Sequence, residues 1–424
     1  MKLSNYTVNV PIENDKFILY NTLKRKYFIY NKEEKNIINS LLDDINKGSY
    51  DLKEIEYMKK FIENGVIIKD DLEELDLIEF AINKRKFGND TLTLVIQPTL
   101  NCNFRCVYCY EKHKNLAMDD ETEVSILKYI KKNVKSYKKI FIGWFGGEPL
   151  LEKDRIINLT RKIKAICEEH SVEYSASMTT NGYLFTEEFI NQIEDLAINK
   201  VQITIDGPKE YHDIKRPLIN GQGTYERIIE NILKLTQKNV LINLRINIDK
   251  ENVEHIEALF DEIPIESREK IIIYISNLFQ SKENFKTFDI YLKAIEKGFK
   301  FNNTANSFIH CEVCKSHGIT IEPNGKVVPC SMASESGYQY GNVNSNGNLI
   351  LQDQNLYYKI KNTSPLKNNK CRTCKKLPIC AGGCSLARYQ DSNYCTENHN
   401  DCLSINELIK LHYYHDEMTK IKEN

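Results

Sequence analysis

Between residues 91 and 278, apolar runs typical of strands alternate with stretches that have the spacing of amphipathic helices. The predicted strands are 92–98, 139–147, 173–182, 201–207, 240–249 and 271–278. The predicted helices that follow the first five strands are 119–135, 151–169, 186–197, 224–238 and 252–262. Strands that alternate with helices predict an α/β fold with a parallel sheet, and this series of units predicts a partial (β/α)6 barrel over residues 89–280.

Residues 1–88 have a different pattern, in which short strands come first and helices follow. The predicted elements are strands at 6–12, 17–22 and 26–31, helices at 33–48 and 53–64, a turn and short strand within 63–71, and a charged connecting helix at 72–86. This order resembles a winged-helix arrangement. A domain that packs against the rest of the chain or mediates dimerisation is the alternative interpretation.

The C-terminal part of the chain divides into a connector and a cysteine-rich region. Residues 281–305 contain one helical stretch, and residues 306–424 contain few long periodic segments before a predicted helix that begins at 404. We therefore expect four segments in all, with boundaries after residues 88, 280 and 305.

Chemically distinctive residues lie at or just after the end of each of the first five predicted strands. They are Cys102, Cys106 and Cys109 after the first strand, Gly146, Gly147, Glu148 and Pro149 at the end of the second, Thr180 and Asn181 at the end of the third, Asp206 at the end of the fourth, and Asn247 near the end of the fifth. Because the carboxyl ends of parallel strands meet at one edge of a sheet, we expect these residues to form one site.

Composition and charge narrow the class of protein. The chain has 424 residues, 41% of them hydrophobic, and a formal net charge of −1, so no strong field favours nucleic acid or a membrane surface. No apolar run reaches the roughly 20 residues of a membrane span, and the N-terminus lacks the apolar core of a signal peptide. We expect a cytoplasmic protein with no nucleic-acid or membrane partner.

The 13 cysteines, most of them after residue 310, are unusual for such a protein. A reducing cytoplasm does not maintain disulfides, so clustered cysteines there more often bind metal. Thiolate sulfur is a soft ligand that suits zinc or iron–sulfur clusters. The cysteines thus predict metal sites in both the barrel and the C-terminal region.

The segment NCNFRCVYCY (101–110) gathers three cysteines and no nearby fourth. Three thiolates can bind three irons of a [4Fe–4S] cluster and leave the fourth iron open, as catalytic metal sites leave a position open for substrate. A zinc site completed elsewhere, for example by His113, is the alternative.

The spacing CxxxCxxC resembles the signature of radical S-adenosylmethionine (SAM) enzymes. GGEP at 146–149 and TTNG at 179–182 resemble two further motifs of this family, and Tyr108 occupies the place of an aromatic residue that packs near adenine. The resemblance implies that the open iron chelates SAM, that one electron cleaves a C–S bond of SAM, and that the 5′-deoxyadenosyl radical takes a hydrogen atom from the substrate. No catalytic residue is assigned beyond the cluster.

The resemblance also suggests residues that contact SAM. GGEP implies a site for the methionine amino group, and Arg245 is a candidate for a two-pronged contact with the SAM carboxylate, with an ordinary ion pair as the alternative. Asp206 is a further candidate because it ends a strand. Residues 206–217 form a predicted loop whose His212, Asp213 and Arg216 contact either substrate or SAM, or else stabilise a turn.

The cysteines after residue 310 resemble the SPASM domain of peptide-modifying radical SAM enzymes. The resemblance implies two auxiliary [4Fe–4S] clusters, and therefore three clusters in all. The implied ligands of the first are Cys311, Cys314, Cys330 and Cys384, and those of the second are Cys371, Cys374, Cys380 and Cys402, with Cys395 as an alternative to Cys402. Two structural zinc sites are the other interpretation, and Cys167 is expected in a helix core.

Enzymes with this domain mostly act on peptides or proteins. Anaerobic sulfatase maturases carry an aspartate base at the position of Ser331, which counts against formylglycine formation here. The N-terminal segment resembles a leader-recognition domain, so we expect a maturase that cross-links a ribosomally made precursor peptide, with a cysteine thioether favoured. An electron donor such as flavodoxin or ferredoxin is implied. The alternative from another class is an iron–sulfur electron-transfer or binding protein without radical chemistry.

Overall fold

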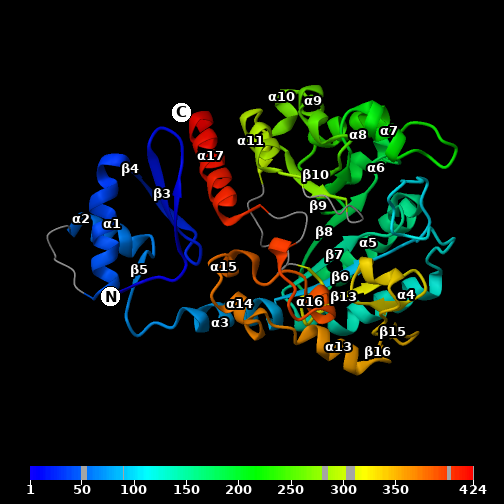
Figure 1. Ribbon diagram of the computed structural model, residues 1–424. Coiled ribbons are helices and arrows are strands. Elements are labelled where there is room, and N and C mark those ends of the chain that lie inside the picture. Colours follow the sequence, from blue (N-terminus) through cyan, green and yellow to red (C-terminus); the bar gives the residue numbers. More distant parts are fainter. Residues whose placement is uncertain (49–54, 89, 279–284, 302–310, 399–402, 424) are drawn as a thin grey trace. The chain divides into compact units, whose positions relative to one another are not determined.

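The computed structural model describes residues 1–48, 55–88, 90–278, 285–301, 311–398 and 403–423 (Figure 1). The chain forms two compact units. The barrel unit consists of Phe87–Asn302 and His310–Thr363, and the N-terminal unit consists mainly of Met1–Lys86 and Ser364–Asn424. The C-terminal region, expected as one segment from 306 to 424, therefore contributes to both units.

The barrel unit is built on a parallel sheet in which neighbouring strands follow one another along the chain. Its central strands are β6 (Thr91–Ile96), β7 (Lys139–Trp144), β8 (Glu173–Thr180), β9 (Ile198–Thr204), β10 (Leu241–Ile248) and β11 (Ile271–Asn277). Each pairs in parallel with the next. The predicted partial (β/α)6 barrel is confirmed.

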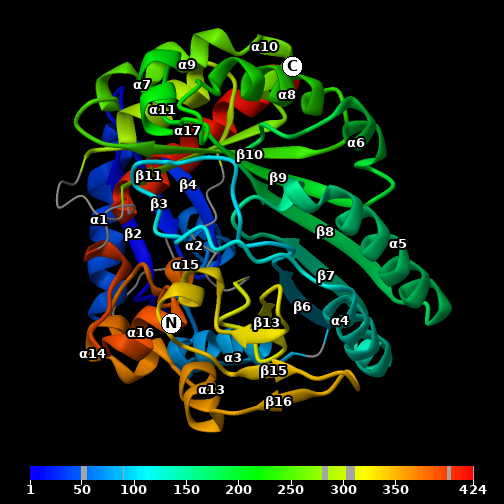
Figure 2. The same ribbon diagram turned by 90° about the vertical axis from the view of Figure 1, so that its right-hand side faces the viewer.

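Helices cover the outer side of this sheet, as Figure 2 shows. They are α4 (Asp120–Asn133), α5 (Lys153–Glu169), α6 (Glu187–Gln192), α8 (Tyr225–Thr236) and α9 (Ile256–Glu262). Capping side chains define where two of them begin, since Asp119 and Thr186 accept hydrogen bonds from the first-turn N–H groups of α4 and α6. Each helix buries apolar residues against the sheet, and most of the buried strand side chains are Ile, Val or Leu, with β8 (EYSASMTT) as the exception.

The sheet extends further than the sequence predicted. At one edge β12 (Lys300–Phe301) joins β11, and at the other β13 (Gly318–Ile321) pairs in parallel with β6. A meander of β14 (Lys326–Val328), β15 (Gly341–Val343) and β16 (Leu349–Leu351) continues the sheet from β13. The first part of the cysteine-rich region thus adds strands directly to the barrel sheet.

The N-terminal unit contains a three-stranded antiparallel sheet with helices on both faces. The sheet is β2 (Thr7–Pro11), β3 (Lys16–Asn21) and β4 (Lys26–Asn31), followed by α1 (Lys32–Asn46), α2 (Ile55–Glu63) and α3 (Glu74–Phe87). A separate pair joins β1 (Lys2–Leu3) to β5 (Ile67–Ile68). These elements match the predicted order, and Asn31 and Glu34 form the capping box that starts α1.

Apolar residues alternate across the N-terminal sheet, so both of its faces are covered. Leu19 and Tyr30 face a core shared with α1 and α2. Val10 and Ile18 face the opposite core, which includes Ile409 of α17 (Ile405–Glu423). Figure 1 shows α17, drawn in red, beside the blue strands.

In the described part of the chain, no helix is both long enough and apolar enough to cross a bilayer.

The core of the barrel gives a stability prediction with a control on the same strand. Leu244 of β10 is fully buried, whereas Leu241 is 38% exposed. We expect Leu244→Ala to lower the free energy of unfolding by about 2–5 kcal/mol, because it removes core contacts and leaves a cavity. Leu241→Ala should change it by no more than about 0.5 kcal/mol. Urea titration followed by circular dichroism measures both, and equal effects would contradict the predicted core position.

Candidate functional site

The cysteine loop, residues 101–110, is fixed to the segment that follows β9. Arg105 N donates to Pro217 O at 2.9 Å, and Val107 N donates to Lys215 O at 3.0 Å. Phe104 and Leu218 form an isolated antiparallel bridge. The loop therefore has a defined backbone conformation at the carboxyl ends of the strands, as the sequence predicted.

The three thiols of this loop lie in a protected environment. Burial raises the pKa of Cys102 to about 12 and that of Cys109 to about 11, and it also raises the pKa of Cys106. Cys106 is close enough to contribute to the shifts of both other thiols. Metal binding requires the thiols to be deprotonated, and burial disfavours the charged thiolate. The positive charge of a bound metal must therefore offset the cost of burying the thiolates.

The loop has the chemistry that an iron–sulfur cluster requires. Phe104 N donates to Cys102 Sγ at 3.4 Å, the kind of backbone contact that stabilises a ligating sulfur. Among the described residues, no group of three His, Cys, Asp or Glu side chains converges as the ligands of one metal ion do. A cluster differs from a single ion because each thiolate binds a different iron. The donor set fits a cluster.

Glu148 of the GGEP motif is a buried organiser of this site. Its carboxylate accepts hydrogen bonds from Thr180 Oγ1 at 2.7 Å and from the backbone N–H groups of Asn181 and Leu150 at 2.7 and 2.9 Å. Burial raises its pKa to about 7, and these hydrogen bonds oppose the rise. Asn181 in turn donates to Asn103 Oδ1 at 2.8 Å, which connects the end of β8 to the cysteine loop.

The two glycines of GGEP allow the end of β7 to approach the cysteine loop closely. A Cβ at Gly146 would lie 2.2 Å from Thr99 O, and one at Gly147 would lie 2.3 Å from Asn101 O. Gly146 also has a positive φ of 130°. Pro149 follows as the first residue of a short 3-10 helix, Pro149–Glu152, where its fixed φ is compatible with the turn. The motif thus sets the distance between β7 and the loop.

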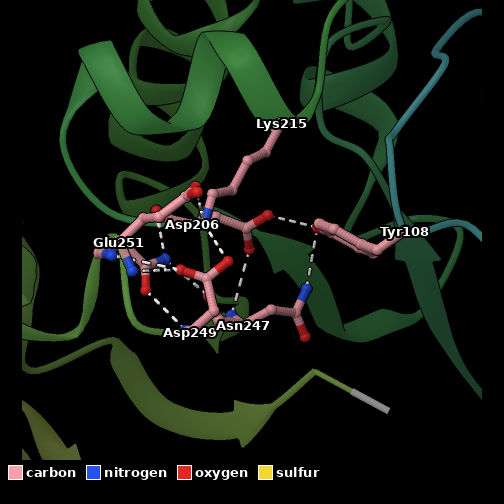
Figure 3. Close-up of polar contacts among 7 residues, drawn as sticks. Tyr108, Asp206, Lys215, Asn247, Asp249 and Glu251 are labelled. Carbon is pink, nitrogen blue, oxygen red and sulfur yellow. Dashed lines mark hydrogen bonds and ion pairs between the residues drawn. The ribbon is translucent and has the colours of Figure 1, made fainter. Parts of the chain in front are cut away.

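Tyr108 connects the cysteine loop to the ends of β9 and β10, as Figure 3 shows. Its hydroxyl donates to Asp206 Oδ2 and accepts from Asn247 Nδ2 at 3.0 Å. Arg216 Nη1 also donates to this hydroxyl, at 2.8 Å. Asp206 is fully buried, which raises its pKa, while the Arg216 guanidinium opposes the rise. The structure therefore brings Tyr108, Asp206 and Asn247 together.

The segment predicted as a loop at 206–217 is largely a helix, α7 (Lys209–Lys215), and that expectation was wrong. Its polar residues serve mainly the local structure. His212 Nδ1 accepts from Asp206 N at 3.2 Å, and burial holds the pKa of His212 well below its usual range. Asp213 accepts from the N–H groups of Thr224 and Tyr225. His212 and Asp213 therefore stabilise the local backbone, which was the alternative to contact with substrate or SAM, whereas Arg216 bonds to Tyr108.

Sequence reasoning missed two supporting groups. Asn252 donates to the backbone oxygens of Asp206 and Asn247, both at 2.9 Å, and so holds the ends of β9 and β10 together. Lys215 is buried and forms ion pairs with Asp249 and, at 3.6 Å, with Glu251 (Figure 3). The turn DKEN at 249–252 directly after the fifth strand was the available signal.

The guanidinium of Arg245 in β10 contacts neutral side chains. Its Nε donates to Asn247 Oδ1 at 2.9 Å and its Nη2 donates to Ser276 Oγ at 3.0 Å, while its Cζ lies 5.4 Å from the Tyr274 ring centroid. In the part of the chain that the structure describes, it forms no ion pair with a carboxylate. The ordinary ion pair considered from the sequence is therefore absent among these residues.

Cys311, Cys314 and Cys330 belong to the barrel unit. Lys361, which is 3% exposed, orders the loop that carries the first two of them. Its ammonium group donates to the backbone oxygens of Glu312, Lys315 and Gly318 at 2.9, 2.6 and 2.7 Å. A buried ammonium that contacts several carbonyl oxygens holds this loop in one conformation.

The other C-terminal cysteines belong to the N-terminal unit. They include Cys371, Cys374, Cys380, Cys384 and Cys395, whereas Cys402 lies outside the described residues. Burial raises the pKa of Cys380 to about 11, with Cys374 and Cys371 as further causes. Cys395 contributes to the raised pKa of Cys374, so this alternative ligand lies near the proposed group. Cys167 is buried in α5, as expected of a core residue.

Comparison with known families identifies the class of protein. Residues 96–263 match the radical SAM superfamily, and residues 311–375 match SPASM, an iron–sulfur cluster-binding domain. The chain is a radical SAM enzyme. More particularly, it belongs to those radical SAM enzymes that carry a SPASM domain, so iron–sulfur clusters and SAM are its implied cofactors. This membership argues against an electron-transfer protein without radical chemistry.

Curated relatives cover most of the chain at low identity. Fe-coproporphyrin III synthase of Methanosarcina barkeri is 23% identical over 70% of this chain and 84% of its own length. The serine-type anaerobic sulfatase-maturating enzyme of Klebsiella aerogenes is 23% identical over 67% of this chain and 76% of its own length. The radical SAM cyclopropyl synthase TigE of Paramaledivibacter caminithermalis is 24% identical over 90% of this chain and 89% of its own length.

Solved structures show the same fold. Native anSMEcpe with bound AdoMet aligns with a TM-score of 0.51 and 20% identity, covering 78% of this chain and 97% of its own. Native anSMEcpe with bound AdoMet and Cp18Cys peptide aligns with a TM-score of 0.50 and 20% identity, covering 78% of this chain and 98% of its own.

The close approach at GGEP can be tested with a matched glycine. We expect Gly147→Ala to displace the cysteine loop and to slow SAM cleavage in the absence of substrate by at least about tenfold, since a misplacement of about 1 Å costs up to ~10²-fold in rate. Gly143→Ala is the control, because its nearest neighbour would be a Val95 side-chain atom at 3.3 Å. The measurement is 5′-deoxyadenosine formed per reconstituted chain. Equal rates for the two variants would contradict the proposed role of this contact.

Proposed function

We propose that this protein is a cytoplasmic peptide maturase that uses SAM to install a cross-link, a cysteine thioether, in a ribosomally made precursor peptide. The observation that carries the radical chemistry is the three-cysteine loop, held at the carboxyl ends of β6–β10 within a matched radical SAM domain. Cys102, Cys106 and Cys109 would hold the SAM-binding cluster. When bound, the cluster and SAM supply a 5′-deoxyadenosyl radical that takes a hydrogen atom from the substrate.

The residues of the barrel would bind and orient SAM. Arg245 is partly buried, and within the described ranges it forms hydrogen bonds only to neutral groups, so it is suited to hold the SAM carboxylate. The GGEP turn would place its backbone beside the methionine amino group, and Thr180 and Asn181 fix its Glu148 carboxylate. Tyr108, Asp206 and Asn247 would support the adenosine side of the site through their shared hydrogen bonds.

The C-terminal cysteines would hold two auxiliary [4Fe–4S] clusters, making three clusters in all. Cys311, Cys314, Cys330 and Cys384 would ligate the first, and Cys371, Cys374, Cys380 and Cys402 the second, with Cys395 as the alternative to Cys402. The match to SPASM over residues 311–375 includes Cys311, Cys314, Cys330, Cys371 and Cys374 and supports the assignment of these five. An electron-transfer protein such as flavodoxin or ferredoxin would supply the reducing electron.

The N-terminal sheet has an open edge suited to a leader peptide. Among the described residues, no strand pairs with the outer side of β4. Thr22 N donates to Tyr6 O and Ile12 N donates to Lys16 O. The backbone N–H and C=O groups of residues 18 and 20 in β3 therefore point toward β2. Hydrogen-bonded and non-hydrogen-bonded pairs alternate along antiparallel strands, so the backbone groups of Phe28 and Tyr30 bond to β3. Those of Tyr27 and Ile29 point to the open edge. An extended peptide could add there as a further strand.

A sulfatase-maturase-like activity is the second candidate, and sequence similarity to the Klebsiella aerogenes enzyme favours it. Ser331 follows Cys330 where those enzymes are expected to carry an aspartate base, and Ser331 is buried. A serine hydroxyl is a far weaker base than a carboxylate, so proton abstraction from a substrate serine or cysteine lacks its expected acceptor. Mass spectrometry of the product separates a cross-linked peptide from a formylglycine-containing one.

The SAM-binding cluster can be tested by removing one thiol. We expect Cys106→Ala, reconstituted anaerobically with iron, sulfide, dithionite and SAM, to form no 5′-deoxyadenosine above background, because the cluster loses one of its three ligands. Cys167→Ala is the matched control, since Cys167 is a buried core thiol of α5. Chromatography of the nucleoside product measures both variants. An active Cys106→Ala variant would overturn the proposed cluster.

Leader binding can be tested at a single backbone N–H. We expect Ile29→Pro to weaken binding of a precursor peptide encoded beside this gene by at least about tenfold, or ~1.4 kcal/mol, because proline removes a donor at the open edge and its ring blocks close approach. Ile29→Val is the control because it keeps the N–H.

Fluorescence anisotropy with the labelled peptide measures the affinity of both variants, and the rate of SAM cleavage without peptide should be the same for both. If Ile29→Pro bound the peptide as tightly as Ile29→Val, the open edge of β4 would not be the leader site. Deletion of residues 1–88 is a less clean test, because Val10 and Ile18 pack against Ile409 in the same unit.

A further inference from the structure

Arg388 is a buried cation that has no acidic partner among the described residues. It lies on α16 (Ser385–Gln390) in the N-terminal unit and is 7% exposed. Among the described residues its guanidinium forms no ion pair, and its Nη1 is buried without a hydrogen-bond partner. A charged group in such a place costs several kcal/mol unless an opposite charge faces it. The burial of Arg388 therefore favours a negatively charged group close to its guanidinium that is not a carboxylate of the described residues.

The surroundings of Arg388 indicate where that negative charge belongs. Its Nη2 donates to Gly382 O and lies 4.0 Å from Cys371 Sγ. Its Cζ lies 5.8 Å from the Tyr394 ring centroid, a contact that orients the guanidinium but supplies no net charge. The sulfur of Cys371 belongs to the set proposed to bind the second auxiliary cluster.

The loop between Cys380 and Cys384 is shaped around this guanidinium. Its residues Ala381, Gly382 and Gly383 all have positive φ, at 47°, 84° and 71°. A Cβ at Gly382 would lie 2.4 Å from Pro365 Cβ, and one at Gly383 would lie 2.4 Å from Thr396 Cγ2. This path turns Gly382 O toward Arg388 and lets Gly382 N donate to Cys380 Sγ at 3.4 Å. Two sulfurs of the set thus have N–H groups directed toward them.

We infer that Arg388 is a positioning residue that raises the reduction potential of the cluster proposed at Cys371, Cys374 and Cys380. This inference rests on the proposed second auxiliary cluster. A cluster ligated by thiolates carries net negative charge, and reduction by one electron adds to it. A buried cation and N–H donors to sulfur therefore stabilise the reduced form more than the oxidised form. The effect exceeds that of an exposed cation because water and salt do not screen it.

The experiment compares the midpoint potential of this cluster in Arg388→Gln and Arg372→Gln holoenzymes. Arg372 is exposed and directly follows Cys371, so it is a matched control for a nearby charge in water. We expect Arg388→Gln to retain iron. Its equilibrium constant for one-electron reduction should fall by about tenfold, which lowers the midpoint potential by roughly 59 mV. Arg372→Gln should leave the potential unchanged. Electron paramagnetic resonance during an anaerobic redox titration measures both.

Cys374→Ala identifies which titration step belongs to this cluster. If Cys374→Ala changed neither the iron content nor any step, the second auxiliary cluster itself would be wrong, and the inference would fail with it. If Cys374→Ala removed one titration step but Arg388→Gln did not change the midpoint potential of that step, only the role of Arg388 would be wrong.

Arg388→Lys provides a second variant in case the glutamine variant loses iron. It keeps the charge but loses the planar fork that reaches both Gly382 O and Cys371. We expect a shift in the same direction that is smaller than tenfold. A shift of tenfold or more in Arg388→Lys, which keeps the charge, would overturn the inference.

Discussion

Two buried carboxylates hold the cysteine loop against the ends of the parallel strands, and the rest of the site depends on them. Glu148 connects the end of β7 to the end of β8, and Asp206 connects the end of β9 to Tyr108 in the loop. Both are fully buried, so each needs its hydrogen bonds to remain stable in an apolar environment. In the described part of the chain, neither carboxylate forms a hydrogen bond with the thiols of Cys102, Cys106 and Cys109. They act by fixing where three thiols stand relative to five strand ends.

The sequence predicted the barrel, and the placement of these residues at its strand ends, because the signals for both are local. The periodicity of strands and helices and the residues at each strand end define the barrel without knowledge of distant contacts. The adjacent glycines Gly146 and Gly147 indicate a close backbone approach from the sequence alone. The addition of β13 to β6 could not be predicted, because a four-residue strand carries no periodic signal and its partner lies more than two hundred residues away. For the same reason, the division of residues 306–424 between two units was missed.

Lys361 and Arg388 show how the same chemistry can serve different purposes. Both are buried cations beside cysteine-bearing loops, and each lies within its own unit. The ammonium of Lys361 is surrounded by carbonyl oxygens at hydrogen-bond distance, so its charge is well compensated and its role is to hold a loop. Among the described residues, Arg388 keeps one buried N–H without a partner. Because buried donors are nearly always satisfied in folded proteins, Arg388 is the better candidate of the two to act on a neighbouring anionic group.

The N-terminal sheet and the cysteines of the proposed second auxiliary cluster share one folding unit. Thr22 Oγ1 donates to Lys375 O at 2.6 Å, and Lys375 Nζ donates to Thr7 O at 2.8 Å. These bonds connect β2 and the β3–β4 turn directly to the segment between Cys374 and Cys380. A strand added at the edge of β4 would extend the same sheet. The proposed peptide-binding edge and the proposed cluster would therefore belong to one packed structure, because residues 1–86 and 364–424 form a single compact unit.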